Sequence, residues 1–501
     1  MPILLRLIPM SYILAIDQGT TSSRVFIYNQ KLERIAQGQK AFQQHFPKPT
    51  WVEHDLEEIW TSVMESLKEA LASVKDPAFD VKKIVSIGIT NQRETFGLWD
   101  KSTNKALAKA IVWQDKRSTD FCNKLKKTAA GKSLEKLSGL VLDPYFSGTK
   151  LSLLLKDLQQ KKNIAFGTMD TFLLWRLSGG KAHATDVSNA SRTLLMDLKK
   201  LEWSPEALKT LKVSSDILPE IMSSDAEFGK TLGLGILPDG IPIHGILGDQ
   251  QSALFGQQCF KEGEAKITYG TGAFMLTNTG SKILRKKGSL STVAWKQNNS
   301  VTYALESSVF ISGAAVQWLR DGLKIISQSS DVENLAKSVS SCDGVFFIPS
   351  LSGLGSPYWI PEAKGMIGGL TRGSTQAHIA RACLEGIAHS VAATFESMSV
   401  DATTKKTSIR VDGGACQNNL LMQMQSDLLQ KTIERPKDVE TTARGAACMA
   451  ALGVRLVDMK TLNEKKDVDF LFKPKLSKAD SKNQKQLWDK RIKALISFSK
   501  T

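Results

Sequence analysis

Two short strand–turn–strand patterns constrain the fold of this chain more than any other feature of its sequence. In residues 12–28, two apolar runs flank the turn Asp17-Gln-Gly-Thr-Thr-Ser-Ser, and in residues 265–278 two apolar runs flank Gly270-Thr271-Gly272. Short runs of strand-forming residues separated by glycine-containing turns predict β-hairpins. Because a similar hairpin opens each half, we expect an internal structural duplication.

The rest of the chain alternates strand and helix patterns. Apolar residues recur at helical spacing in residues 56–74 and 376–398, while continuous apolar runs at residues 84–90 and 241–247 predict buried strands. Such alternation is typical of α/β domains, in which helices cover the faces of a sheet.

The domain organisation follows from the chain length and the two hairpins. A chain of 501 residues has room for two or three domains at about 150 residues each. We place a boundary near residues 256–264, which gives an N-terminal domain at 11–258 and a C-terminal domain at 259–501. Residues 1–10 are expected to be a non-essential extension. Because no flexible linker separates the halves, we expect them to meet in a cleft with a hinge.

The charge balance is basic, with 66 Lys and Arg residues against 50 Asp and Glu and a net charge of +16. The excess is densest in residues 464–501, where the basic residues share a helical pattern with Leu487, Ile492, Leu495 and Ile496. We interpret this segment as a solvated helix face and expect no nucleic-acid partner.

Membrane insertion and disulfide bonding are also disfavoured. No apolar run reaches the roughly 20 residues that a membrane-spanning helix needs, so we expect no stable membrane insertion. The six cysteines and six histidines are scattered, which argues against a zinc module or a disulfide framework. This pattern favours a reducing compartment, the cytoplasm.

The first hairpin turn has the composition of a phosphate site. Asp17 ends a buried strand, and the glycine, threonines and serines that follow can surround phosphate oxygens, with Arg24 as a forked donor. A carboxylate such as Asp17 suits a hydrated Mg²⁺ better than a phosphate. An ordinary hairpin turn rich in Ser and Thr is equally consistent with this motif alone.

Two glycine-rich turns in the second half could contact other parts of a nucleotide. Gly270-Thr271-Gly272 could approach the phosphates, and the paired glycines after Asp412 would let a flat base and its ribose approach the backbone at a helix start. Structural roles are the alternatives, since an isolated Gly-Thr-Gly is usually structural and Asp412 and Asn418 suit turn and cap positions.

Asp249 directly follows the apolar run at 241–247 and Gly248 and opens a helical run. A carboxylate at such a junction can accept the proton of a hydroxyl group that attacks phosphorus. The alternative is a helix N-cap, for which Asp is well suited, and for this residue in isolation the cap is favoured.

Two polar motifs predict a pocket for a small hydroxylated ligand. Arg93 and Glu94 follow the strand at 84–90, and Tyr145 belongs to the stretch Asp143-Pro-Tyr-Phe-Ser-Gly-Thr-Lys150. Together they offer hydrogen-bond donors, acceptors and an aromatic surface to a ligand without charge. Trp113 and Phe274 could add apolar surface. A surface Arg–Glu pair and a buried tyrosine are the structural alternative.

Two familiar nucleotide motifs are excluded. Gly131-Lys132-Ser133 resembles the end of a Walker A loop, but Lys126 stands where the first glycine is required and the preceding segment is charged and helical. The chain also lacks a G-x-G-x-x-G stretch after a strand, so a nicotinamide-binding Rossmann unit is not indicated.

Taken together, these motifs resemble the FGGY family of carbohydrate kinases from about Tyr12 to Gly453. The stretches at 91–94 and 143–150 are similar to the branch of the family that acts on glycerol. The resemblance implies an α/β fold of two ribonuclease-H-like domains, of the actin and hexokinase ATPase type, with an interdomain active-site cleft. It also implies ATP-dependent phosphorylation of glycerol to sn-glycerol 3-phosphate, in glycerol catabolism.

The resemblance further implies roles for individual residues. Asp249 would be the catalytic general base, and Asp17 would lie near Mg²⁺. Glycerol would be held by Arg93, Glu94, Tyr145, Asp249, Gln250 and Phe274. ATP would contact Thr20, Thr21, Ser22, Arg24, Thr271, Gly313, Gln317, Gly414 and Asn418.

Further expectations concern assembly and rival activities. From the resemblance we expect a homo-oligomer, a dimer or tetramer. Two alternatives stay open: a kinase for another polyol or for a ketose such as xylulose, and an actin- or chaperone-like ATPase without a small acceptor.

Overall fold

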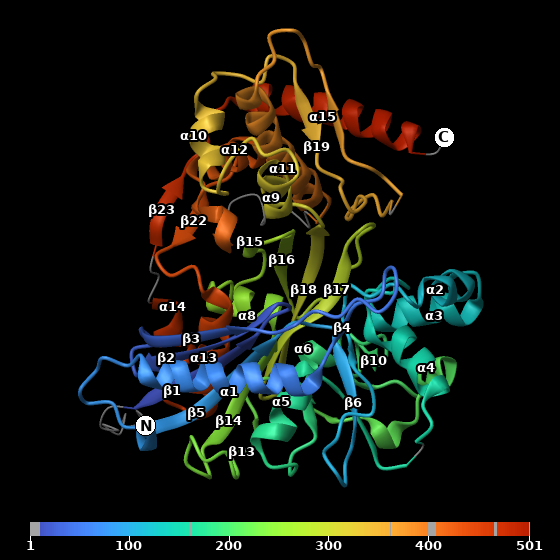
Figure 1. The fold of residues 1–501 in the computed structure, drawn as a ribbon, viewed down its shortest axis with the longest axis vertical. Coiled ribbons are helices and arrows are strands. Elements are labelled where there is room, and N and C mark those ends of the chain that lie inside the picture. The colour runs from blue at the N-terminus through green and yellow to red at the C-terminus, as the bar shows by residue number, and fades with distance from the viewer. Residues whose placement is uncertain (1–10, 161, 361, 399–406, 465–467, 500–501) are drawn as a thin grey trace. The chain divides into compact units, whose positions relative to one another are not determined.

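The structure, a computed structural model, describes residues 11–160, 162–360, 362–398, 407–464 and 468–499. The expected extension at residues 1–10 lies outside the described residues. The chain divides into two compact units (Figure 1). Unit 1 comprises Met1–Gln258, Ser291–Tyr303 and Thr441–Lys465, and unit 2 comprises Cys259–Leu290, Ala304–Glu440 and Lys466–Thr501.

Unit 1 is built on a six-stranded sheet in the order β13-β14-β5-β1-β2-β3. The central strands β14, β5 and β1 are parallel, and β1, β2 and β3 are antiparallel, which confirms the first predicted hairpin. The strands are β1 (Tyr12–Gln18), β2 (Ser22–Asn29), β3 (Arg34–Ala41), β5 (Ile84–Asn91), β13 (Glu227–Lys230) and β14 (Pro242–Gly248).

Side-chain alternation along β1 explains how both faces of this sheet are covered. Leu14 and Ile16 pack in the cluster that includes one face of α1 (Leu56–Ala72), whereas Ile13 and Ala15 pack against the alanines of α13 (Thr441–Gly453). Successive strand residues point to opposite faces, so one strand serves two layers. Figure 1 shows α1 beside β2 and β3, with α13 also in this unit.

Unit 1 contains further strands and helices beside this sheet. A second sheet has the order β4-β7-β6-β8. Its strands are β4 (Glu53–His54), β6 (Phe96–Asp100), β7 (Ala110–Ile111) and β8 (Ile164–Thr168), and the short strands are β9 (Ala184–Asp186), β10 (Met196–Asp197), β11 (Glu202–Trp203) and β12 (Glu220–Met222). The helices are α2 (Thr119–Lys126), α3 (Ala129–Ser138), α4 (Ser147–Asp157), α5 (Met169–Leu177), α6 (Val187–Ala190), α7 (Pro205–Leu211), α8 (Asp249–Gly256) and α14 (Met459–Glu464). Gly131-Lys132-Ser133 lies inside α3, which confirms that it is not a phosphate loop.

Unit 2 contains most of a seven-stranded sheet in the order β17-β18-β16-β15-β21-β22-β23. The second predicted hairpin is confirmed as β15 and β16, and β15 is parallel to β21 as β1 is to β5. This repeated arrangement supports the expected duplication. The strands of this sheet are β15 (Ala265–Tyr269), β16 (Ala273–Gly280), β17 (Leu290–Gln297), β18 (Ser300–Val309), β21 (Ile409–Asp412), β22 (Ile433–Pro436) and β23 (Val468–Phe472). A separate two-stranded sheet pairs β19 (Phe346–Ile348) with β20 (Met366–Gly368).

Helices of unit 2 bury an apolar core that includes Ile267, Leu384 and Val411. They are α9 (Gly313–Asp321), α10 (Asp331–Lys337), α11 (Gln376–Met398) and α12 (Asn419–Leu429). Helix α15 (Lys478–Phe498) packs in a separate apolar cluster that includes Ile348. The basic helix α15 is amphipathic: Trp488, Ile492 and Leu495 are buried, while Leu487 is 47% exposed. Leu487 therefore lies outside the buried face of this helix.

Two further observations bear on the chemistry of the chain. All six cysteines are buried and unpaired. None of the helices in the described ranges combines the length and apolar character needed to cross a bilayer.

Candidate active site

The ends of three neighbouring parallel strands bring the predicted residues of unit 1 to one edge of the sheet. Asp17 at the end of β1 is in register with Thr90 on β5, and Gly248 at the end of β14 is in register with Asn91. Asp249 begins α8 immediately after β14. Because parallel strands end at the same edge, the loops that follow them converge there, as is common at ligand sites in such sheets.

Arg93 is the centre of the first group of side chains. Its Nε lies 3.1 Å from Oδ1 of Asp249 and 4.0 Å from Oε1 of Glu94. Its Nη1 donates a hydrogen bond of 3.2 Å to Oε1 of Gln251. Arg93 and Glu94 are 2% and 1% exposed, whereas the Asp249 side chain is 32% exposed. Asp249 is therefore the member of this group that faces solvent.

The alternative role of Asp249 as a helix cap is wrong. The N-cap of α8 is Gly248, and Asp249 is the first residue inside the helix. Its Oδ1 accepts a 2.6 Å hydrogen bond from the amide of Gln250. A carboxylate in the first helical turn is stabilised by the positive end of the helix dipole.

Glu94 is held from two sides in an unusual backbone conformation. Its φ is 62°, a left-handed value that costs of order 1–3 kcal/mol for a residue with a side chain. Nε of Arg192 donates a 2.7 Å hydrogen bond to its carboxylate, and Oγ of Ser147 donates a 2.7 Å bond to its carbonyl. Sequence reasoning did not single out Arg192 as a site residue, although the stretch Asn189-Ala-Ser-Arg192 also resembles the FGGY family.

An aromatic pair lies beside these charged residues. The rings of Trp113 and Tyr145 meet edge to face with centroids 5.4 Å apart. Nε1 of Trp113 donates a 3.0 Å hydrogen bond to Oγ1 of Thr20, which joins the aromatic pair to the first hairpin turn.

Two other predicted acceptor residues lie on different elements. Gln250 is buried on α8, whereas Phe274 is half-buried on β16 and belongs to unit 2.

The first hairpin turn is partly exposed at Thr20, Thr21 and Ser22. The amide of Gly19 bonds to the carbonyl of Ser22 at 2.9 Å and closes the turn. Thr21 is exposed, and Thr20 and Ser22 are half-buried. Arg24 forms an ion pair with Asp17, whose side chain is 4% exposed. The guanidinium predicted to bind phosphate is thus already engaged in part by Asp17.

In unit 2 the second hairpin turn is fastened to the start of α9. The carbonyl of Gly270 accepts from the amide of Gly313 at 3.0 Å, and the carbonyl of Thr271 accepts from the amide of Ser312 at 2.8 Å. A Cβ at Gly313 would lie 2.7 Å from the carbonyl oxygen of Gly270, so this approach requires glycine. The structure therefore brings Thr271 and Gly313 together, with Gln317 exposed on the same helix.

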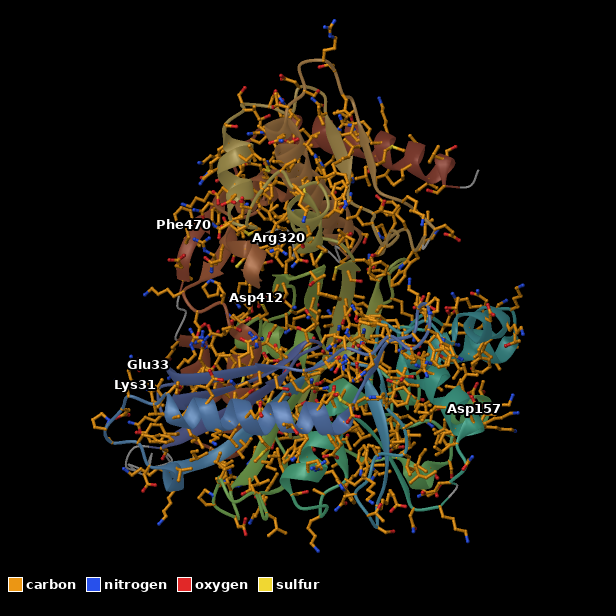
Figure 2. All side chains as sticks on the ribbon, in the orientation of Figure 1. Lys31, Glu33, Asp157, Arg320, Asp412 and Phe470 are labelled. Atoms are coloured by element: carbon orange, nitrogen blue, oxygen red, sulfur yellow. The ribbon has the colours of Figure 1, made fainter. Side chains whose placement is uncertain are left out.

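The third glycine-rich turn follows β21, which ends at Asp412 (Figure 2). Gly413 has a φ of 82°, and a Cβ there would lie 2.5 Å from the carbonyl oxygen of Tyr269. Gly414 differs, because a Cβ there would meet nothing within 4 Å. Asn418 caps α12 by accepting a 2.8 Å bond from the amide of Leu421, which confirms its alternative role as a cap.

A buried polar network supports the strand ends of unit 1. Oγ of Ser188 accepts a 3.0 Å bond from the amide of Gly248 and donates a 2.9 Å bond to Asp186. Burial raises the pKa of Asp186. Asn91 and Asn189 exchange two side-chain bonds of 3.1 Å. This network fixes the backbone just before Asp249, and sequence reasoning missed it.

Comparisons with known proteins agree on one family. Family models described as the N-terminal and C-terminal domains of the FGGY family of carbohydrate kinases match residues 12–256 and 265–454. The chain is 52% identical to the glycerol kinase of Bdellovibrio bacteriovorus, covering 95% of this chain and 98% of that protein. It is 48% identical to the glycerol kinase of Myxococcus xanthus, with 96% and 98% covered. Among solved structures, it is similar to Plasmodium falciparum glycerol kinase with ADP, at a TM-score of 0.88, 35% identity and coverage of 97% and 98%.

Proposed function

The chain belongs to the FGGY family of carbohydrate kinases, and we propose that it transfers the terminal phosphoryl group of ATP to glycerol, forming sn-glycerol 3-phosphate. One observation carries the proposal: Arg93 contacts both Asp249 and Glu94 at the strand-end edge of unit 1. Relatives named glycerol kinase, up to 52% identical over nearly the whole chain, support the same acceptor.

Glycerol has three hydroxyl groups and no charge, so its recognition depends on directed hydrogen bonds. We assign the donors to Arg93 and Gln250 and the acceptors to Glu94 and Asp249. The buried pairing of Glu94 with Arg192 supports an ordered acceptor, because a carboxylate fixed before binding loses little freedom when a hydroxyl arrives. Tyr145 and Phe274 are assigned to the apolar carbon chain.

In the proposed reaction Asp249 is the general base. As the terminal hydroxyl oxygen attacks the γ-phosphorus in line, its proton moves to the Asp249 carboxylate and the bond from phosphorus to the ADP oxygen breaks. The partial exposure of Asp249 within an otherwise buried group supports this role, since the base must reach a bound ligand. Arg93 orients this carboxylate through its Nε.

We assign nucleotide binding to both units. In unit 1 the hydroxyls and amides of Thr20, Thr21 and Ser22 suit phosphate oxygens, with Arg24 beside them. In unit 2 the assigned residues are Thr271, Gly313, Gln317, Gly414 and Asn418. The open space beside Gly414 supports a close approach by a flat base or ribose.

The residues present fit a magnesium ion held through water. The described residues include no cluster of three or more His, Cys, Asp or Glu side chains able to hold a metal. Mg²⁺ commonly binds through one or two carboxylates, several waters and substrate phosphates. Asp17, with Arg24 engaging one side of its carboxylate, suits contact through such waters. When bound, the ion would neutralise charge on the phosphate oxygens.

Compartment and assembly complete the proposal. Six unpaired cysteines support a reducing compartment, and we propose the cytoplasm. We also propose that the enzyme works as a homo-oligomer, which light scattering of the purified protein would test.

The experiment that tests the function is acceptor-dependent ADP release by the purified protein with ATP and Mg²⁺. We expect release with glycerol and much less with dihydroxyacetone or xylulose. Faster release with xylulose would assign the chain to a ketose. Steady ATP hydrolysis unaffected by any polyol would contradict phosphoryl transfer to a small acceptor.

A further inference from the structure

Lys150 is a fully buried lysine in the first turn of α4, with 0% of its surface exposed. Its Nζ donates hydrogen bonds to three main-chain carbonyl oxygens, those of Val112 at 2.9 Å, Tyr145 at 3.3 Å and Trp113 at 3.4 Å. An ammonium group has three N–H donors and no acceptor. Each donor therefore has a carbonyl partner.

A buried ammonium is costly, so a packing role alone would be filled more stably by an apolar side chain. Transfer of a charge to the interior is strongly unfavourable unless the charge is hydrogen-bonded or paired. Burial lowers the pKa of Lys150 to about 8, against the opposing attraction of Asp115, Glu94 and Asp143. Lysine makes three directed hydrogen bonds at this position, which leucine or methionine could not make.

The three carbonyls belong to two segments that carry the aromatic pair. Val112 and Trp113 follow β7, whereas Tyr145 lies just before α4. The Trp113 and Tyr145 rings meet at 5.4 Å. Because one Nζ bonds to the backbone of both segments, it fixes the separation of their main chains and hence the geometry of the rings.

The rest of this turn contacts the segments that carry Glu94 and Arg192. Ser147 donates to the carbonyl of Glu94 at 2.7 Å. The amide of Gly148 donates to the carbonyl of Thr193 at 2.8 Å, next to the Arg192 that holds Glu94. The first turn of α4 therefore contacts the segments that carry Glu94, Trp113 and Tyr145.

We infer that Lys150 is a positioning residue that holds Trp113 and Tyr145 in the geometry needed to bind the acceptor, without touching the acceptor itself. The inference rests on the proposed function, because it concerns the pocket assigned to glycerol. A misplacement of about 1 Å in a binding group can cost up to 100-fold in rate. Because the two rings are assigned to the acceptor and not to ATP, the role should appear mainly in KM for glycerol.

The experiment compares Lys150→Met and Lys150→Gln with Lys156→Met, an exposed lysine of the same helix. Steady-state kinetics give KM for glycerol, KM for ATP and kcat. We expect Lys150→Met to raise KM for glycerol about tenfold or more, with KM for ATP within about twofold. Lys150→Gln retains two N–H donors on a shorter side chain and should fall between wild type and Lys150→Met. Lys156→Met should match wild type.

A second measurement separates positioning from stability. Glycerol should raise the melting temperature of wild type and of Lys156→Met, and much less that of Lys150→Met. Three results would each overturn the inference. They are an equal change in KM for glycerol, KM for ATP and kcat, an unchanged KM for glycerol, and failure of both Lys150 variants to fold. The wild type alone tests the proposed function. If it uses another acceptor, KM for that acceptor is compared between the variants and wild type in the same way.

Discussion

The guanidinium of Arg93 lies between two carboxylates, with its Nε 3.1 Å from Asp249 and 4.0 Å from Glu94. The two acids differ in their surroundings. Glu94 is also bonded to Arg192 and is 1% exposed, whereas the Asp249 side chain is 32% exposed. One buried cation thus orients both a fixed acid and an accessible acid. This asymmetry suits a site in which one carboxylate holds a hydroxyl and the other removes its proton.

Replacing Asp249 by Asn should lower turnover by about 10²- to 10⁴-fold, because the amide cannot accept the hydroxyl proton. The change preserves size and removes one charge, so ATP affinity should remain close to that of wild type. Steady-state kinetics and nucleotide titration check the two parts. Asp157→Asn, at the exposed end of α4, is the matched control and should behave as wild type (Figure 2). Undiminished turnover in Asp249→Asn would refute its assignment as base.

Replacing Arg192 by Met should destabilise unit 1 by about 3 kcal/mol, since it leaves the buried Glu94 carboxylate with a weaker set of partners. Adding Glu94→Gln should recover part of this loss, because an unpaired amide costs less to bury than an unpaired charge. Urea unfolding of the single and double variants measures both effects. If the double variant is less stable than Arg192→Met, the buried charge is not the cause.

Asp170 predicts a pH dependence of stability. It is fully buried, and burial raises its pKa to about 7, although Thr168 and Thr185 donate hydrogen bonds to its two oxygens. Between the unfolded pKa near 3.8 and about 7, the folded chain holds a proton that the unfolded chain releases. The free energy of unfolding should therefore fall as pH rises across this window.

The test for Asp170 is a comparison with Asp170→Asn, which does not titrate. Urea unfolding at pH 5 and pH 7.5 gives the free energy of unfolding of each protein at both pH values. This free energy should decrease more for wild type than for the variant, because all other titrating groups are the same in both. Parallel pH profiles for the two proteins would show that this carboxyl has an ordinary pKa.

Local patterns in the sequence predict much of this fold because its elements have strong periodicity. The hairpin at residues 12–28, the buried strand at 84–90 and the helix at 376–398 all depend on the order of apolar residues within one segment. The position of α13 could not be predicted from the order of its apolar residues. Its alanine-rich sequence is small and apolar on most sides, so its local pattern does not indicate which sheet it covers.

The proposed site shows the same division between local and long-range information. Asp17 lies at the end of a recognisable strand, and Arg93 and Asp249 follow two others, so converging strand ends explain why they share an edge. The pairing of Glu94 with Arg192 joins residues 98 positions apart. Nothing in the local sequence of either residue specifies its partner, so the support that holds Glu94 emerges only from the tertiary structure.

Adjacent glycines after β21 separate a folding role from a binding role. Gly413→Ala should destabilise unit 2 by about 1–3 kcal/mol, because its φ of 82° is strained for alanine and the new Cβ would lie 2.5 Å from a carbonyl oxygen. Gly414→Ala meets nothing within 4 Å and should fold as wild type. If the nucleotide approaches the backbone there, the added methyl group should raise KM for ATP several-fold and leave KM for glycerol unchanged. Thermal melting and kinetics of the two variants measure this contrast. A Gly414→Ala enzyme with an unaltered KM for ATP would remove Gly414 from the proposed nucleotide site, while the behaviour of Gly413→Ala would still report on the backbone alone.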